Sequence, residues 1–357
     1  MVEGGDEPVK RALLLGYFGA GNWGDELILE CFLRGYGDIL REKGFELAVT
    51  VKRPANAAYR EHLGELWPGL DLVQMGPLLP CSLGLRKSSH LICPGGSLLQ
   101  NRTSNRSLGY YLSIISAFLR GGRAAMMLNQ GLGPIRGELW EARTREVLSQ
   151  LQFFSARDRR SAMWAAESVP SDRRLLTSDA VFAALPDWEY EPAGGESWDY
   201  CFVVRAQVGS PLLSSPQFPP DGRYLVAVLQ EDEWKQPRRI EHLGRRLDRE
   251  SLALLNASSF VRKLRQCKLV VSERYHGLVA ALIAGVPFVG VGDDPKLSSF
   301  CGECDMPACT ERSVSVGTLE KLKKEALERF RAEVFRERVA DFVDRHRRQR
   351  ERLIELL

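Results

Sequence analysis

The fold is decided by the stretch from Leu269 to Ala284, which reads Leu-Val-Val-Ser-Glu-Arg-Tyr-His-Gly-Leu-Val-Ala-Ala-Leu-Ile-Ala. The order of an apolar run, a polar turn and an apolar helical segment predicts a strand, a sharp turn and a helix. In an open α/β sheet, ligands bind beyond the carboxyl ends of the strands, which is where this turn would lie. Arg274, His276 and the start of the helix suit a small anion that also exchanges a proton. A helix-capping histidine beside a surface arginine is the alternative.

The rest of the chain repeats this alternation of short apolar runs and helical patterns. Strands are predicted at 13–15, 46–51, 71–75, 91–93, 124–128, 153–154, 200–204, 224–229, 269–271 and 287–291. Such alternation indicates βαβ units and parallel sheets. A chain of 357 residues favours two domains. We place them at 1–190 and 191–357, joined near a Pro/Gly-rich linker at 192–197, with a long charged helix, straight or kinked, from Thr318 to Leu357. We therefore expect two doubly wound, Rossmann-like domains facing across a cleft, the glycosyltransferase-B type.

Composition excludes several classes of protein. The net charge is only +3, which gives no case for binding nucleic acid. The sequence has no run of 18 apolar residues that would span a bilayer. Its first residues, Met1 to Glu7, are acidic and lack the apolar core of a signal peptide. We expect a cytoplasmic protein.

Eight cysteines in a chain of this length do not indicate a disulfide framework. Cys301, Cys304 and Cys309 form a cluster that amounts to half of a zinc site, with no histidine nearby in the sequence. Free thiols are the expectation and no metal is assigned, although zinc ligands distant in the sequence leave that question open.

A glycine-rich loop, Gly-Tyr-Phe-Gly-Ala-Gly-Asn-Trp-Gly-Asp-Glu at residues 16–26, follows the first strand. Its glycines permit close approach of a ligand to the backbone. Asp25 and Glu26 at the helix start would repel a phosphate, so a dinucleotide is not expected here. Asp25 is a candidate for holding a sugar hydroxyl or for acting as a general base, and an N-cap role is the alternative.

Two further loops follow predicted strands. Pro94-Gly95-Gly96-Ser97 presents backbone amides that suit substrate oxygens, or it forms a simple tight turn. Arg205 ends the strand 200–204, and together with Arg274 it would make a two-arginine clamp for a carboxylate and a phosphate. The loop 209–223 is either a lid or a surface insertion.

Near the C-terminus, Arg345, Arg347, Arg348, Arg350 and Arg352 form a basic run. It fits a solvated helix end, and it also leaves open a peripheral contact with anionic lipid at the inner face of the membrane.

Taken together, these segments resemble the polysaccharide pyruvyl transferase family, in particular its CsaB-like cell-wall members. The resemblance rests on the loop 16–26, on 94–97, on 156–161, on 178–182, on Arg274–Gly277 with 284–288, and on 294–296. Tyr275 and Ala180 depart from the residues common in the family.

The resemblance implies pyruvyl transfer from phosphoenolpyruvate to a sugar, with the formation of a pyruvate ketal. Arg205, Arg274 and His276 would bind the donor on the side of the second domain, and His276 would supply a proton. Asp25 would act on an acceptor hydroxyl on the side of the first domain, beside a loop surface of Gly21, Asn22, Gly24, Glu26, Gly95, Gly96 and Ser97. The acceptor implied is lipid-linked N-acetylmannosamine of a cell-wall polymer used for S-layer anchoring. No cofactor is implied, and the oligomeric state is left open.

Two rival functions remain. A nucleotide-sugar glycosyltransferase of the same fold would need a carboxylate for the ribose, for which Glu273 is a poor candidate. A non-catalytic glycan-binding protein would not need arginine, histidine and aspartate together.

Overall fold

The computed structural model describes residues 10–76, 83–102, 104–185, 198–205, 210–215, 220–234, 257–310 and 314–357. The chain divides into two compact units. Unit 1 comprises Met1–Ala20, Asp25–Leu185 and Phe342–Leu357, and unit 2 comprises Gly21–Gly24 and Pro186–Asp341. The predicted division at residues 190 and 191 falls within 186–197, outside the described residues. Residues 21–24 therefore belong to the unit formed mainly by the second half of the chain, and residues 342–357 belong to the unit formed mainly by the first half.

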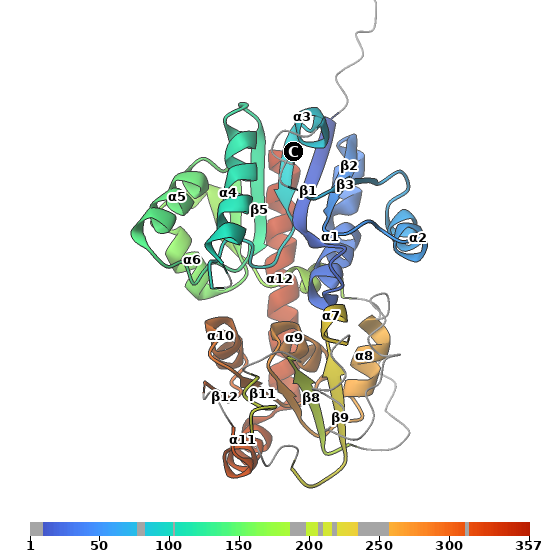
Figure 1. Cartoon of the computed structure of the whole chain (residues 1–357), viewed down its shortest axis with the longest axis vertical. Coiled ribbons are helices and arrows are strands. Elements are labelled where there is room, and N and C mark those ends of the chain that lie inside the picture. The colour runs from blue at the N-terminus through green and yellow to red at the C-terminus, as the bar shows by residue number, and fades with distance from the viewer. Residues whose placement is uncertain are drawn as a thin grey trace, which may run out of the picture. The chain divides into compact units, whose positions relative to one another are not determined.

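Unit 1 contains a parallel seven-stranded sheet of order β3-β2-β1-β4-β5-β6-β7 (Figure 1). The strands are β1 (Lys10–Phe18), β2 (Phe45–Val51), β3 (Asp71–Gln74), β4 (His90–Cys93), β5 (Ala124–Gln130), β6 (Phe153–Ala156) and β7 (Arg174–Leu176). The helices are α1 (Trp23–Glu42, from Asp25 on in unit 1), α2 (Ala57–Leu66), α3 (Leu83–Lys87), α4 (Asn105–Leu119), α5 (Glu138–Ser149) and α6 (Arg159–Ala165). The strand order reverses between β1 and β4, which is the doubly wound arrangement expected.

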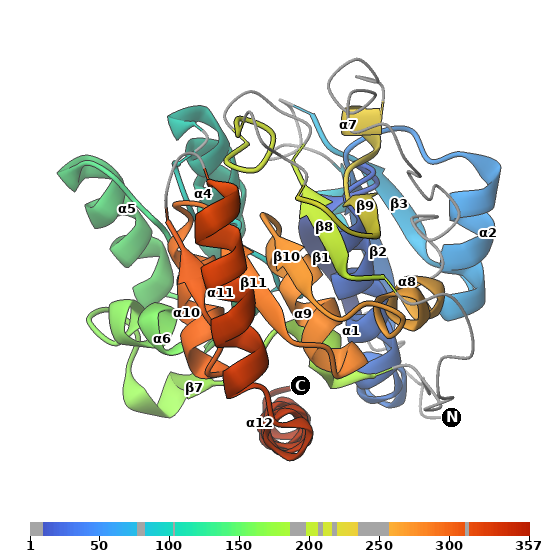
Figure 2. The same ribbon diagram turned by 90° about the horizontal axis from the view of Figure 1, so that it is seen from below.

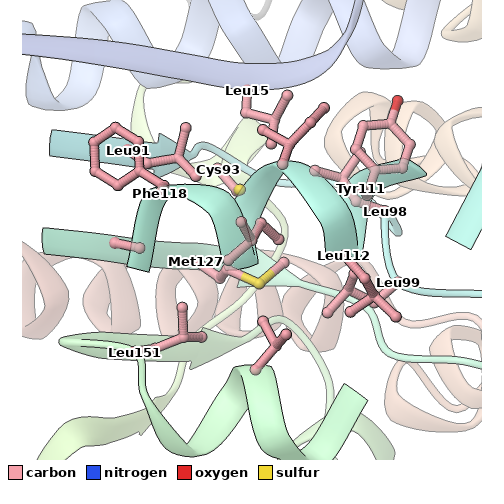
Figure 3. Packing of buried hydrophobic residues seen from close by; sticks show 14 of the residues in the cluster. Leu15, Leu91, Cys93, Leu98, Leu99, Tyr111, Leu112, Phe118, Met127 and Leu151 are labelled. Atoms are coloured by element: carbon pink, nitrogen blue, oxygen red, sulfur yellow. The ribbon is translucent and has the colours of Figure 1, made fainter. Parts of the chain in front are cut away.

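The core of unit 1 lies on both faces of this sheet. On one face, Leu15, Cys93 and Met127 from the strands pack against Leu112 and Phe118 of α4 (Figure 3). On the other face, Ile92 and Leu128 line the same apolar space as Phe32 of α1 and Leu353 of the C-terminal helix. Adjacent residues of β4 and β5 thus point to opposite sides, as the period of a strand requires. Both faces are covered, so these strands read as continuous apolar runs.

Unit 2 contains a parallel five-stranded sheet of order β12-β11-β10-β8-β9 (Figure 2). The strands are β8 (Tyr200–Val204), β9 (Tyr224–Val228), β10 (Val270–Ser272), β11 (Phe288–Val291) and β12 (Ala308–Cys309). The helices are α7 (Glu231–Trp234), α8 (Ala257–Leu264), α9 (Tyr275–Ala284), α10 (Pro295–Glu303) and α11 (Val316–Arg329). The order reverses between β8 and β10, so the crevice of this sheet lies at the ends of those two strands.

The tail, predicted as one long charged helix from Thr318 to Leu357 with or without a kink, forms two helices. The helix α11 ends at Arg329, Phe330 adopts an extended conformation with ψ 129°, and α12 runs from Ala332 to Leu356. The ring of Phe330 contacts that of Phe335 with centroids 5.0 Å apart, and Phe335 also contacts Phe288 of β11. The break therefore lets two aromatic rings reach the core of unit 2. From Phe342 onward α12 is grouped with unit 1, where the sequence had assigned the whole tail to the second domain.

The cysteines are all in the thiol state within the described residues. Cys301, Cys304 and Cys309 are buried, and burial raises the pKa of the Cys301 thiol to about 12. No group of three histidine, cysteine or acidic side chains suited to a metal occurs among the residues that the structure describes. A Cβ at Gly290 would lie 2.7 Å from the sulfur of Cys301, so this thiol fills the space above β11 as a small apolar group.

Candidate functional site

The predicted strand–turn–helix of unit 2 is present. β10 ends at Ser272, Arg274 is the N-cap residue of α9, and Gly285 ends that helix in the left-handed conformation. The backbone N–H of Arg274 donates to Oγ of Ser272 (3.0 Å), and that hydroxyl donates to the carbonyl oxygen of Arg274 (2.7 Å). A Cβ at position 277 would lie 2.3 Å from the same Oγ, so Gly277 leaves room for this serine. Ser272 thus shapes the turn, a role that the sequence prediction missed.

Arg205 and Arg274 follow β8 and β10, which are paired strands at the reversal point of the sheet. The link between the two loops is Glu273, whose side chain is buried. Its carboxylate accepts hydrogen bonds from the backbone N–H of Arg205 (2.7 Å), from Oγ of Ser210 (2.7 Å) and from the N–H of Leu212 (2.9 Å). Burial raises the pKa of Glu273, and the N–H donors of Leu212 and Arg205 oppose that shift. Glu273 therefore ties the loop after β8 to the end of β10.

Each predicted donor-binding arginine is paired with a carboxylate that the sequence analysis did not select. The guanidinium of Arg274 forms an ion pair with the buried Glu233 of α7. The guanidinium of Arg205 lies 3.9 Å from Oδ2 of Asp294, whose same oxygen lies 3.3 Å from Nζ of Lys296. Because β11 neighbours β10, the loop that carries Asp294 lies at the same edge of the sheet. The ion pairs described at this edge therefore join three cations to two carboxylates, and the buried carboxyl of Glu273 lies beside them.

The glycine-rich loop is divided between the two units. Residues 21–24 belong to unit 2, where Trp23 N–H donates to the carbonyl of Leu229 (3.0 Å) and Glu231 N–H donates to that of Gly21 (2.8 Å). Asn22 forms an isolated antiparallel bridge with Gln230, and the ring of Trp23 packs edge-on against Phe260 at 5.1 Å. We call residues 21–24 the glycine segment.

The glycine segment contacts the predicted acid directly. A Cβ on Gly24 would lie 2.0 Å from Nδ1 of His276, so the imidazole occupies the space that any other residue would need. Gly21 has φ 73°, and a Cβ there would lie 2.6 Å from Oε2 of Glu231. In unit 2 the structure therefore places Gly24 against His276, whereas Gly21 and Asn22 pair with Glu231 and Gln230. Arg205 and Arg274 lie after two paired strands of the same sheet.

The other predicted residues lie in unit 1, at the reversal point between β1 and β4. Gly96 follows β4 with φ 94°, and a Cβ there would lie 3.7 Å from Oδ1 of Asp25. A Cβ on Gly95 would lie 2.9 Å from Cγ2 of Ile28, so this loop packs directly on α1. Asp25 is half-buried and lies near the backbone of the loop 94–97, as expected for residues at one sheet edge.

Ser97 is held by a buried ion pair. Its Oγ accepts from Nη2 of Arg157 (2.9 Å), and Nη1 of that arginine donates to Oδ2 of Asp179 (3.0 Å). Both charged side chains are almost completely buried, with 2% and 0% of their surface exposed. The pair fixes the loop after β4 to the ends of β6 and β7.

Glu26 is buried in unit 1 and forms a carboxyl–phenol hydrogen bond. The hydroxyl of Tyr59 on α2 donates to Oε2 of Glu26 at 2.5 Å, while Oε1 is buried without a hydrogen-bond partner among the described residues. Burial raises the pKa of Glu26 to about 7; Asp25 adds to that shift, and the bond from Tyr59 and the N–H groups of Gly19 and Ala20 oppose it. Glu26 is therefore engaged with Tyr59 inside unit 1, a partner that no sequence pattern indicated, and its place in an acceptor site stays a prediction.

The basic run of α12 is largely neutralised by its neighbours. Arg350 pairs with Asp38, Arg347 and Arg348 pair with Asp344, Arg352 pairs with Glu355, and Arg345 is buried. The structure therefore favours the solvated and packed helix end over a lipid-binding face. Within the described part of the chain, no helix is long and apolar enough to cross a membrane.

Comparison with solved structures defines the class of fold. UDP-GlcNAc 2-epimerase from Neisseria meningitidis, bound to UDP-GlcNAc, matches with TM-score 0.58 and 13% identity over 97% of this chain and 100% of that chain. The UDP-GlcNAc 2-epimerase from Methanocaldococcus jannaschii matches with TM-score 0.59 and 11% identity over 96% and 98%. The HepE protein from Anabaena, in complex with UDP and glucose, matches with TM-score 0.59 and 12% identity over 96% and 99%. The predicted glycosyltransferase-B-type fold is thus confirmed, and at these identities the likeness concerns the fold alone.

The family model described as polysaccharide pyruvyl transferase matches residues 22–295. The chain belongs to this family. None of the curated proteins matches the sequence. Residues 22–295 include part of the glycine segment, the loop 94–97, Arg205 and the Arg274–Gly277 turn.

Proposed function

We propose that this protein transfers the pyruvyl group of phosphoenolpyruvate to a sugar of a surface polysaccharide and releases phosphate. The observation that carries the proposal is the placement of Arg205, Arg274 and His276 at the reversal point of the unit 2 sheet, in a chain of the pyruvyl transferase family. Arginines suit a donor that carries both a carboxylate and a phosphate. We further propose the CsaB-like subtype, with lipid-linked N-acetylmannosamine as the acceptor and S-layer anchoring as the purpose.

The chemistry assigns a task to each of these side chains. A proton must reach the methylene carbon of the donor, and a sugar hydroxyl must add to the neighbouring carbon. The bond from that carbon to the phosphate oxygen then breaks, and a second hydroxyl adds to close the ketal. Of the two hydroxyl protons, one equivalent ends in the new methyl group and the other on phosphate. We assign the proton donation to His276 and the removal of a hydroxyl proton to Asp25.

The rival glycosyltransferase function is less well supported by unit 2. A nucleotide-sugar enzyme needs a carboxylate for the ribose, and the epimerase of Neisseria meningitidis was solved with UDP-GlcNAc bound. In this chain Glu273 already accepts hydrogen bonds from Arg205, Ser210 and Leu212. Its oxygens are therefore engaged with the protein itself.

The test combines turnover with binding. Purified protein is incubated with phosphoenolpyruvate and an N-acetylmannosaminyl acceptor, and released phosphate and product mass are followed together. We expect acceptor-dependent phosphate release and a mass gain of one pyruvyl ketal. His276→Gln should abolish release, whereas the matched control Arg336→Gln, at an arginine whose side chain is 75% exposed, should retain it. Thermal stabilisation by UDP and none by phosphoenolpyruvate would contradict the proposal and favour the glycosyltransferase.

A further inference from the structure

The ion pair between Arg274 and Glu233 is a feature of unit 2 that the proposed reaction does not by itself require. The side chain of Glu233 is 2% exposed and that of Arg274 is 18% exposed. Glu233 lies on α7, which follows β9, and β9 pairs with β8. A buried carboxylate beside a residue expected to bind an anion is unfavourable for that binding on charge alone. We therefore look for a role of Glu233 that does not depend on its charge alone.

Glu233 is held in place by backbone contacts of α7 and of the segment that precedes it. Its own N–H donates to the carbonyl of Gln230 (3.1 Å), and the preceding segment pairs with the glycine segment through Trp23 and Glu231. The ring of Trp23, which is 2% exposed, anchors that pairing against Phe260. The carboxylate of Glu233 is thus fixed relative to the sheet, and the glycine segment that contacts His276 is part of the same support.

A guanidinium presents its N–H donors in a rigid planar fork. A fixed carboxylate on one part of the fork therefore sets the direction in which the other donors point. We propose that Glu233 is a positioning residue, which orients Arg274 so that phosphoenolpyruvate is received in a single geometry. The inference rests on the proposed function, because it concerns binding of that donor.

Charge and orientation predict opposite results when Glu233 is changed. Removing a negative charge near an anion site should tighten donor binding if only charge matters. If Glu233 orients Arg274, Glu233→Ala should instead raise the dissociation constant for phosphoenolpyruvate by about tenfold, the scale of one charge-assisted hydrogen bond. Glu233→Gln keeps an acceptor oxygen of similar reach, so a smaller rise of about threefold is expected.

The experiment measures phosphoenolpyruvate binding by calorimetry, together with KM and kcat where turnover is seen. Asp221→Asn, at an exposed carboxylate of the same unit, is the control for net charge. In an Arg274→Gln background, Glu233→Gln should cause no further loss, because the two residues act as one unit. Unchanged or tighter binding by the Glu233 variants would overturn the inference, and Glu233→Gln alone decides it if Glu233→Ala does not fold. If the wild-type protein itself does not bind phosphoenolpyruvate, the proposed function fails instead.

Discussion

At the scale of single residues, Gly24 shows how a backbone position controls a side chain. Its Cα faces the imidazole of His276, and a Cβ would lie 2.0 Å from Nδ1. Real Cβ atoms do not approach another atom this closely, so even a methyl group must displace the ring. The position of the proposed proton donor therefore depends on the absence of a side chain at Gly24 in the glycine segment.

We expect Gly24→Ala to lower kcat for phosphate release by tenfold or more, roughly the effect of misplacing a reacting group by about an ångström. The comparison is Gly64→Ala on α2, where a Cβ would meet nothing within 4 Å. That change should leave kcat unaltered and, since alanine favours helices, stabilise the fold by up to about 1 kcal/mol. Equal kcat values for the two variants would show that His276 is not held by Gly24 in the reactive state.

Several site residues were predictable from the sequence, and their partners were not. Arg205 follows β8 directly, and Arg274 and His276 lie in the turn and first helical residues after β10, so their place at the sheet edge could be inferred. Glu233 lies on the short helix after β9 and Tyr59 lies on α2, and they reach Arg274 and Glu26 only through the fold. A local sequence pattern carries no information about which side chain, distant in the sequence, will contact its residues in the folded protein. The functional roles themselves stay predictions.

At the scale of elements, most strands were predicted, whereas the short strands β7 and β12 and some helix ends were not. Buried strands are visible in the sequence as apolar runs, whereas the first turn of α4, behind the N-cap Ser104, is polar and gives no such signal. The break between α11 and α12 has no glycine or proline to mark it. It follows from the packing of Phe330 and Phe335, which is a tertiary effect.

The last part of α12 contributes to unit 1 through buried polar groups. Nε2 of Gln349, which is fully buried, donates to the hydroxyl of Tyr36 (2.8 Å) and to Oδ1 of Asn129 (3.1 Å). The neighbouring Arg350 makes its ion pair with Asp38 at the surface. We expect Gln349→Leu to lower the free energy of unfolding by about 2–3 kcal/mol, because the buried Tyr36 hydroxyl and Oδ1 of Asn129 each lose a hydrogen bond.

Arg350→Gln is the matched comparison on the same helix, and it should cost at most about 1 kcal/mol because its pair is partly exposed. Chemical denaturation of both variants measures the difference. A larger loss for Arg350→Gln than for Gln349→Leu would mean that surface charge, and not the buried network, holds this end of α12 to unit 1.

At the scale of the whole molecule, two buried groups of unit 1 give stability opposite dependences on pH. Burial raises the pKa of Glu26 to about 7, so its contribution is present below its ordinary value of 4.5 and is lost as pH rises through 7. Burial lowers the pKa of His346 to about 4, so its contribution is present above 6.5 and is lost as pH falls through 4. Each shift corresponds to about 3 kcal/mol. Between about pH 4.5 and 6.5, the contribution of Glu26 to stability therefore falls with rising pH while that of His346 increases.

Glu26→Gln should therefore become more stable relative to the wild-type protein by up to about 3 kcal/mol as pH rises from 4.5 to above 7. Urea denaturation at a series of pH values measures this difference, with Glu138→Gln at an exposed glutamate of α5 as the control. A difference that does not change with pH would show that the carboxyl of Glu26 titrates normally.

The assignment of residues 21–24 to unit 2 has a consequence for dissecting the chain. A fragment that starts after residue 197 would contain every strand of the unit 2 sheet and still lack the backbone partners of Leu229 and Glu231. A synthetic peptide that spans the glycine segment should bind such a fragment, because it restores those backbone hydrogen bonds. The two halves of this enzyme are thus interlaced along the sequence, and neither can be excised by a single cut.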